Sequence, residues 1–107
     1  MKNIRVKRKY FSLIASGAKD REVRTRLPLF DAVTAGETLR FVCGKERIPA
    51  RVHAVRRYRR LLCLVLREPA GRILPGAKRP QVYRTIRAIY PREKRALGFV
   101  VIEFELA

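Results

Sequence analysis

The sequence predicts one α+β domain built on a small, curved, mostly antiparallel β-sheet or barrel with short helices. Its 107 residues are enough for one ordinary domain, and 48% of them are apolar and spread along the whole length. Five segments alternate apolar and polar residues, as strands with one buried face do. Short helical segments separate them, without the repeated apolar strands typical of parallel sheets. We therefore expect residues 1–107 to form a single domain.

The N-terminal third predicts a strand, a short helix and a second strand. Ile4 and Val6 alternate with charged residues, and residues 10–14 then place apolar side chains on one helical face. Gly17 is well placed to end this helix in the left-handed conformation. The strict alternation of residues 19–27 indicates a strand with one charged face. Val23, Thr25 and Leu27 lie on one side of it, and Asp20, Glu22, Arg24 and Arg26 on the other.

The middle of the chain predicts two further strands and a helix. Residues 36–43 and 48–59 alternate on either side of a turn, which places Val52 and Ala54 inward in the second strand. The uniformly apolar segment 61–66 suits a buried strand or a buried helix equally well by pattern. We interpret it as a helix.

The C-terminal third predicts a turn, a helix and a final strand. Residues 73–76 have the composition of a turn, and Pro80 occupies a suitable first helical position. Apolar residues then recur at helical spacing until Pro91. After a basic loop, residues 99–106 show the clearest alternation in the chain.

The charge of the chain points to a polyanionic partner. Its formal net charge is +17, with 26 Lys and Arg residues against nine acidic ones. Self-repulsion of this size opposes folding unless a polyanion or counterions offset it, so we expect RNA as the partner. Most of the basic residues are arginines, which favour bidentate phosphate contacts and stacking on bases. Genome composition or adaptation to heat is an alternative explanation for the arginines.

Several classes of function lack their signatures. Cys43 and Cys63 have no paired metal-ligand spacing and are expected to be buried, reduced thiols. His53 is the only histidine, and neither Ser12 nor Ser16 lies in a Gly-x-Ser-x-Gly turn. We expect no metal and no cofactor. The absence of an 18-residue apolar stretch and of a signal-peptide core predicts a cytoplasmic protein with no membrane association.

The segment from Tyr10 to Arg24 carries the strongest functional signal. Lys19, Glu22 and Arg24 follow one another closely just after the helix-ending Gly17. An ammonium, a carboxylate and a guanidinium at such a corner can form a recognition or reaction site. The alternative is an exposed strand whose charges pair with one another and contribute under about 1 kcal/mol per pair.

These residues resemble the ASCH domain family, which is related in fold to the PUA domains of RNA-modifying enzymes. The similarity extends over nearly the full length, and its residues occur in the family's order and spacing. They are Tyr10, Phe11, Ile14, Gly17, Lys19, Glu22 and Arg24, then Gly36-Glu37-x-Leu39-x-Phe41, Arg51-Val52, Val55, Tyr58, Ile73-Leu74-Pro75-Gly76, Tyr83, Tyr90 and residues 98–104.

The resemblance implies a PUA-like barrel and a cleft beside the corner after Gly17. Lys19, Glu22, Arg24 and Arg26 would there contact an RNA or nucleotide ligand. Some relatives hydrolyse the amide of N4-acetylcytidine with a lysine, a threonine and a glutamate, and another is a ribonuclease. For an amidohydrolase acting on N4-acylated cytidine, Lys19 and Glu22 are the catalytic candidates. Glu22 stands where those enzymes have threonine, and Glu68 is the nearest later carboxylate.

A second basic segment suggests a nucleic-acid contact. Four arginines surround one tyrosine, so they can bind backbone phosphates while the ring stacks on a base; the alternative is a solvated strand end. The residues are Arg56, Arg57, Tyr58, Arg59 and Arg60. The leading interpretation is a monomeric RNA- or nucleotide-binding domain in RNA metabolism or processing. An enzyme acting on a modified nucleoside is the main alternative.

Overall fold

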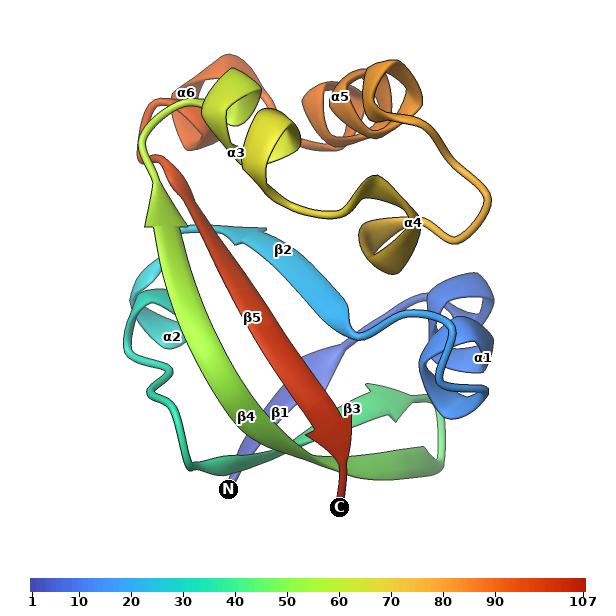
Figure 1. The fold of residues 1–107 in the computed structure, drawn as a ribbon. Coiled ribbons are helices and arrows are strands. Elements are labelled where there is room, and N and C mark those ends of the chain that lie inside the picture. Colours follow the sequence, from blue (N-terminus) through green and yellow to red (C-terminus); the bar gives the residue numbers. More distant parts are fainter.

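A curled mixed sheet of five strands forms the frame of the molecule (Figure 1). The computed structural model describes residues 1–107. The strands are β1 (Lys2–Arg5), β2 (Arg21–Thr25), β3 (Thr38–Cys43), β4 (Glu46–Tyr58) and β5 (Phe99–Leu106), in the order β1-β3-β4-β5-β2. Only the β1–β3 pair is parallel. The predicted α+β class and mostly antiparallel curved sheet are therefore confirmed. The sheet is a half-barrel, because its two edge strands, β1 and β2, do not pair with each other.

Six helices surround this sheet. They are α1 (Arg8–Ala15), α2 (Pro28–Asp31), α3 (Leu61–Arg67), α4 (Ala70–Ile73), α5 (Arg79–Ile89) and α6 (Arg92–Arg95). Figure 1 shows α3, α4, α5 and α6 gathered in one layer at the end of the sheet away from the two termini. The predicted helices near residues 10–14, 61–66 and 80–90 are confirmed. The single-turn helices α2, α4 and α6 were not predicted, because four residues are too few to show a period. None of the helices has the length and apolar character needed to cross a bilayer.

The two faces of β5 belong to two separate apolar clusters. Val100, Ile102 and Phe104 pack inside the curl of the sheet, whereas Phe99 and Val101 pack against the helical layer. Successive side chains of β5 therefore point alternately into two apolar cores, and not alternately into a core and into solvent. Burial on both faces makes β5 the central element of the fold.

A β-bulge at His53 changes which side of β4 faces the helices. The pairing with β5 steps from Val52 opposite Phe104 to Ala54 opposite Glu103, which leaves His53 unpaired. The extra residue reverses the alternation, so Val55 packs with Val52 inside the curl. The predicted inward position of Ala54 is wrong for this reason, because periodicity alone does not reveal an inserted residue.

The bulge also directs Arg56 and Tyr58 to a buried carboxylate. Glu68 is only 2% exposed and accepts hydrogen bonds from Arg56 Nε at 2.6 Å and Nη2 at 2.8 Å. The Tyr58 hydroxyl donates to the same carboxylate, and Arg21 Nε lies 3.7 Å from it. Burial opposes ionisation of Glu68, but the hydrogen bonds from Arg56 and Tyr58 outweigh it and hold its pKa below the usual range. This cluster ties the end of α3 to the sheet.

Both cysteines are free thiols, as expected, but the prediction that they are buried is wrong. Cys43 is partly exposed at the end of β3, and Cys63 is exposed on α3. In α3 the inward face is formed by Leu61, Leu64 and Val65, so Cys63 falls on the outer face. A uniformly apolar helix does not show from sequence which residues face outward.

Candidate functional site

The corner between α1 and β2 delivers Lys19 to the interior. Phe11 and Ile14 form the buried face of α1, and Gly17 ends the turn after it with a φ of +81°. This left-handed conformation is inexpensive only for glycine. The backbone N–H of Lys19 then donates to the carbonyl of Leu13 at 3.1 Å, which directs the chain back along the helix toward β2.

Lys19, Glu22 and Arg24 form one connected ion-pair network. Lys19 Nζ lies 3.4 Å from Glu22 Oε1, and Arg24 Nε donates to Glu22 Oε2 at 2.7 Å. Lys19 and Glu22 are 4% and 6% exposed. The structure thus brings the three predicted residues together, with Lys19 and Glu22 buried and Arg24 partly exposed, so that charged groups share strong hydrogen bonds.

The ammonium of Lys19 is held by three acceptors. Besides the Glu22 carboxylate, it donates to the carbonyls of Arg21 at 2.6 Å and Ile73 at 2.8 Å. A lysine has three N–H donors and no acceptor while charged. These contacts therefore engage all three N–H donors of the ammonium group within the protein, and they join β2 to α4.

Arg24 spans the open edges of the half-barrel. Its Nη2 donates to the carbonyl of Arg5 on β1 at 2.7 Å, and its guanidinium carbon lies 4.9 Å from the ring centre of Phe30. No backbone pairing joins β1 to β2. The Arg24 side chain therefore bridges the gap in the sheet and fixes the position of the guanidinium.

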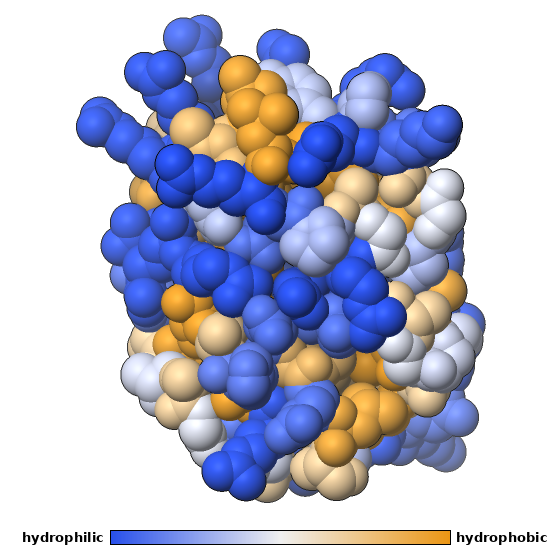
Figure 2. All heavy atoms as spheres, in the orientation of Figure 1, coloured by the Kyte–Doolittle hydropathy of each residue, from blue (hydrophilic) through white to orange (hydrophobic).

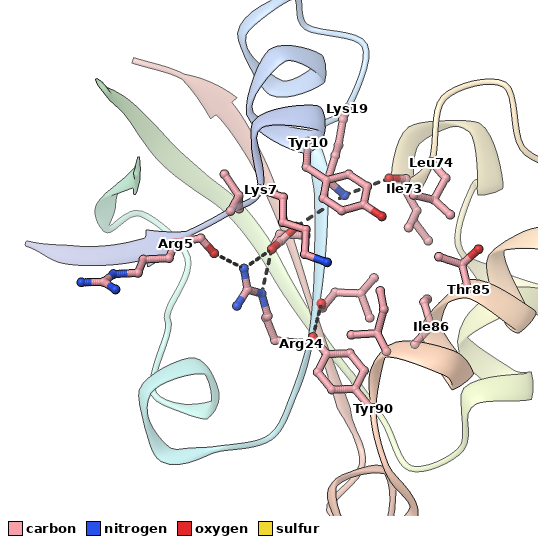
Figure 3. Close-up of a pocket in the computed structure, with 14 residues that line it drawn as sticks. Arg5, Lys7, Tyr10, Lys19, Arg24, Ile73, Leu74, Thr85, Ile86 and Tyr90 are labelled. Atoms are coloured by element: carbon pink, nitrogen blue, oxygen red, sulfur yellow. Dashed lines mark hydrogen bonds and ion pairs between the residues drawn. The ribbon is translucent and has the colours of Figure 1, made fainter. Parts of the chain in front are cut away.

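A cavity of about 270 Å³ opens above this network. Figure 3 shows Lys7 and Tyr10 on one side of it and Thr85, Ile86 and Tyr90 on the other. The Tyr90 hydroxyl donates to the carbonyl of Val23 at 3.2 Å, and burial raises the pKa of Tyr90 to about 12. The full lining is Arg5, Val6, Lys7, Tyr10, Lys19, Glu22, Val23, Arg24, Ile73, Leu74, Thr85, Ile86, Ile89 and Tyr90.

Several of these lining residues were missing from the predicted site. Lys7 precedes α1, and Thr85 and Tyr90 come from the far end of the chain, so no spacing motif connects them with Lys19. Tyr90 packs in part against the helical core and also borders the cavity. Only the resemblance, which included Tyr10 and Tyr90, contained a signal for the aromatic walls.

The fourth predicted ligand residue, Arg26, lies outside the cavity. Its Nε donates to Asp31 Oδ1 at 2.9 Å near the end of α2. Glu68 is also absent from the cavity lining, since it is held by Arg56 and Tyr58 on the helical side of the sheet. The cavity therefore contains one carboxylate, that of Glu22.

The predicted nucleic-acid segment divides into two parts. Arg56 and Tyr58 bind Glu68, and Arg57 donates to Asp31 at 2.9 Å, so these three side chains have partners within the protein. Arg59 and Arg60 are exposed beyond the end of β4. No group of three or more His, Cys, Asp or Glu side chains lies close enough to hold a metal ion.

Comparison with known proteins identifies the fold. No family model matches the chain, and no curated protein matches it significantly. The crystal structure of hypothetical protein PH0355 is similar at a TM-score of 0.88 and 26% identity, over 100% of both chains. The solution structure of protein PF0455 from Pyrococcus furiosus is similar at a TM-score of 0.76 and 25% identity, over 98% of this chain and 96% of that one. Membership of the ASCH family stays a prediction. The chain shares its fold, along essentially its entire length, with two archaeal proteins whose names state no activity.

Proposed function

We propose that this protein binds RNA by accepting a nucleotide in the cavity between α1, β2 and α5. One observation carries the proposal: the Lys19–Glu22–Arg24 network forms one wall of an otherwise largely apolar cavity that two tyrosine rings border. Ligand sites in proteins combine apolar and aromatic walls with a few fixed polar groups in this way.

The chemistry of the walls suits a heterocyclic base. Tyr10 and Tyr90 offer flat apolar surfaces, and the Glu22 carboxylate can accept from an amino or imino group of the base. Arg24 Nη1 has no hydrogen bond within the protein and can donate to a base oxygen or a phosphate. The volume is close to the lower end of the roughly 300–1,000 Å³ typical of ligand sites, which suits a single nucleotide.

The geometry supports binding more strongly than hydrolysis. A lysine that acts as a general base must be neutral, whereas Lys19 donates to two carbonyls and pairs with Glu22. Glu22 occupies the threonine's place in the lysine–threonine–glutamate set, and the nearest later carboxylate, Glu68, lies outside the cavity, where Arg56 binds it.

Titration with the four ribonucleoside monophosphates, followed by calorimetry or NMR, tests the proposal. We expect at least one to bind, and Arg24→Ala to weaken that binding about tenfold or more, because a hydrogen bond to a charged group contributes about 1.5–3 kcal/mol. Thr85→Tyr fills the cavity without touching the ion pairs and should also abolish binding. Arg26→Ala is the matched control and should bind within about twofold of the natural protein.

Two results would overturn the proposal. One is the absence of binding by all four nucleotides at millimolar concentration. The other is unchanged affinity in folded Arg24→Ala and Thr85→Tyr proteins, with melting temperatures recorded for each variant to show that the fold is retained.

A further inference from the structure

A second hollow lies at the end of the molecule formed by α3, α5 and α6. It has a volume of about 360 Å³, and five arginines but no carboxylate line it. Figure 2 shows hydrophilic side chains projecting around this end of the molecule, where Figure 1 places the three helices. The arginines are Arg59, Arg60, Arg87, Arg92 and Arg95.

Four of these guanidinium groups have no partner in the protein. Only Arg95 is held, by donating to the carbonyls of Arg87 at 3.0 Å and Tyr90 at 2.9 Å. Seven of the nine carboxylates form ion pairs with other residues, so they are not available to this cluster. No carboxylate lines the hollow and none forms an ion pair with these four guanidinium groups, so their mutual repulsion favours the binding of an external anion.

Helix α5 is a wall shared by both hollows. Thr85, Ile86 and Ile89 line the nucleotide cavity, whereas Tyr83 and Arg87 line the arginine hollow. A helix with its side chains is about 10–12 Å across, so the two sites are separated by one helix. A single polynucleotide strand that passes around α5 can occupy both.

From this juxtaposition we infer that the arginine hollow binds the phosphate backbone of an RNA strand whose base occupies the cavity. The inference rests on the proposed function and specifies its ligand as a polynucleotide, not a free nucleotide. Guanidinium groups bind phosphate oxygens bidentately, and Tyr83 at the hollow offers a ring for base stacking.

Salt-dependent binding of a 12-nucleotide single-stranded RNA tests the inference. The variant is Arg87→Gln with Arg92→Gln, because both side chains are exposed and form no hydrogen bond or ion pair within the protein. The matched control is Lys45→Gln with Arg51→Gln, which removes the same charge from exposed positions in the turn before β4 and within that strand. Each protein is titrated between 50 and 200 mM salt, and mononucleotide binding is measured in parallel.

We expect the Arg87/Arg92 variant to bind the RNA at least tenfold more weakly at low salt. Its log-log salt slope should be shallower by about 1.4, since each lost phosphate contact on a single strand accounts for about 0.7. The control should shift the slope far less, and mononucleotide affinity should be unchanged in both proteins.

The outcomes separate this inference from the proposed function. If mononucleotides bind but the Arg87/Arg92 variant and the control have equal salt slopes, the inference is overturned and the proposed function is retained. Absence of any nucleotide binding overturns the proposed function itself. Binding of the hollow to phosphatidylserine vesicles without binding to RNA also overturns the inference, because it identifies a lipid surface as the anion.

Discussion

Replacement of Glu68 by glutamine is the most direct test of how the helical layer is held to the sheet. Glutamine has nearly the same shape as glutamate but no charge, so packing is retained while the ion pairs are lost. In the natural protein the Glu68 carboxylate accepts two hydrogen bonds from Arg56 and one from Tyr58, and Arg21 lies within 3.7 Å. In the variant the guanidinium groups of Arg56 and Arg21 would lie beside a neutral amide instead of a carboxylate.

The expected loss of stability is about 2–3 kcal/mol. Removing one partner of a fully buried ion pair costs about 3–5 kcal/mol. The cost is lower here because the Arg56 side chain is 35% exposed and also pairs with Glu103 at 2.9 Å. At about 2.1 cal/mol/K per residue the unfolding entropy of the chain is roughly 0.22 kcal/mol/K, so the melting temperature should fall by about 9–13 °C.

The pH dependence of this difference follows from the lowered pKa of Glu68. A carboxyl group whose pKa is lower in the folded state stabilises the fold fully above its unfolded value of 4.5 and loses that contribution as the pH falls through the folded value. The gap in melting temperature between the natural protein and Glu68→Gln should therefore be largest at neutral pH and narrow below pH 4.5.

Thermal unfolding followed by circular dichroism from pH 7 to pH 3 measures both effects. Glu105→Gln is the control, because Glu105 is exposed and forms no ion pair. A melting temperature for Glu68→Gln equal to that of the control, or a gap that stays constant in acid, would refute the reasoning.

Three further predictions concern stability and are checked by urea denaturation. Lys19→Met should destabilise the fold by about 3–5 kcal/mol, since it removes the cation beside the buried Glu22 Oε1 and leaves two carbonyls without their donor; a loss below about 1 kcal/mol would contradict the buried network. Tyr90→Phe removes the hydrogen bond to Val23 but keeps the ring, so we expect a loss of about 1 kcal/mol with nucleotide affinity unchanged. Gly98→Ala should cost at least about 1 kcal/mol more than Gly44→Ala, because both have positive φ but only at Gly98 would a Cβ lie 3.1 Å from a backbone oxygen. Equal losses for the two glycines would refute that steric argument.

The periodicity of apolar residues predicted the strands and the longer helices, but not what the faces of the strands pack against. The strands and the helices near residues 10–14, 61–66 and 80–90 follow from spacing of apolar side chains. Alternation in β2 assigned Glu22 and Arg24 to one face, and nothing in the pattern shows that this face borders a cavity. That information comes from α4 and α5, which are more than 45 residues away in the chain.

The candidate site divides in the same way. The sequence predicted that Lys19, Glu22 and Arg24 lie together, because they are close neighbours on one corner. It did not predict the opposite wall at Thr85, since only the tertiary structure brings α5 to this position. The predicted nucleic-acid contact of residues 56–60 failed in part for another reason. The bulge in β4 turns Arg56 toward Glu68, so fewer arginines of this segment are free to bind a ligand than a count of charges suggests.

Because His53 is unpaired in the β-bulge of β4, the deletion of a single residue at this point would change which side chains of the strand face the interior. Upstream of His53 the even-numbered Ala50 and Val52 pack inside the curl, and downstream of it the odd-numbered Val55 does. Loss of one residue at this point would exchange the surroundings of every side chain from position 54 to 58, placing a guanidinium among hydrocarbons. Alignments of related chains should therefore permit no gap here unless a second length change nearby restores the parity.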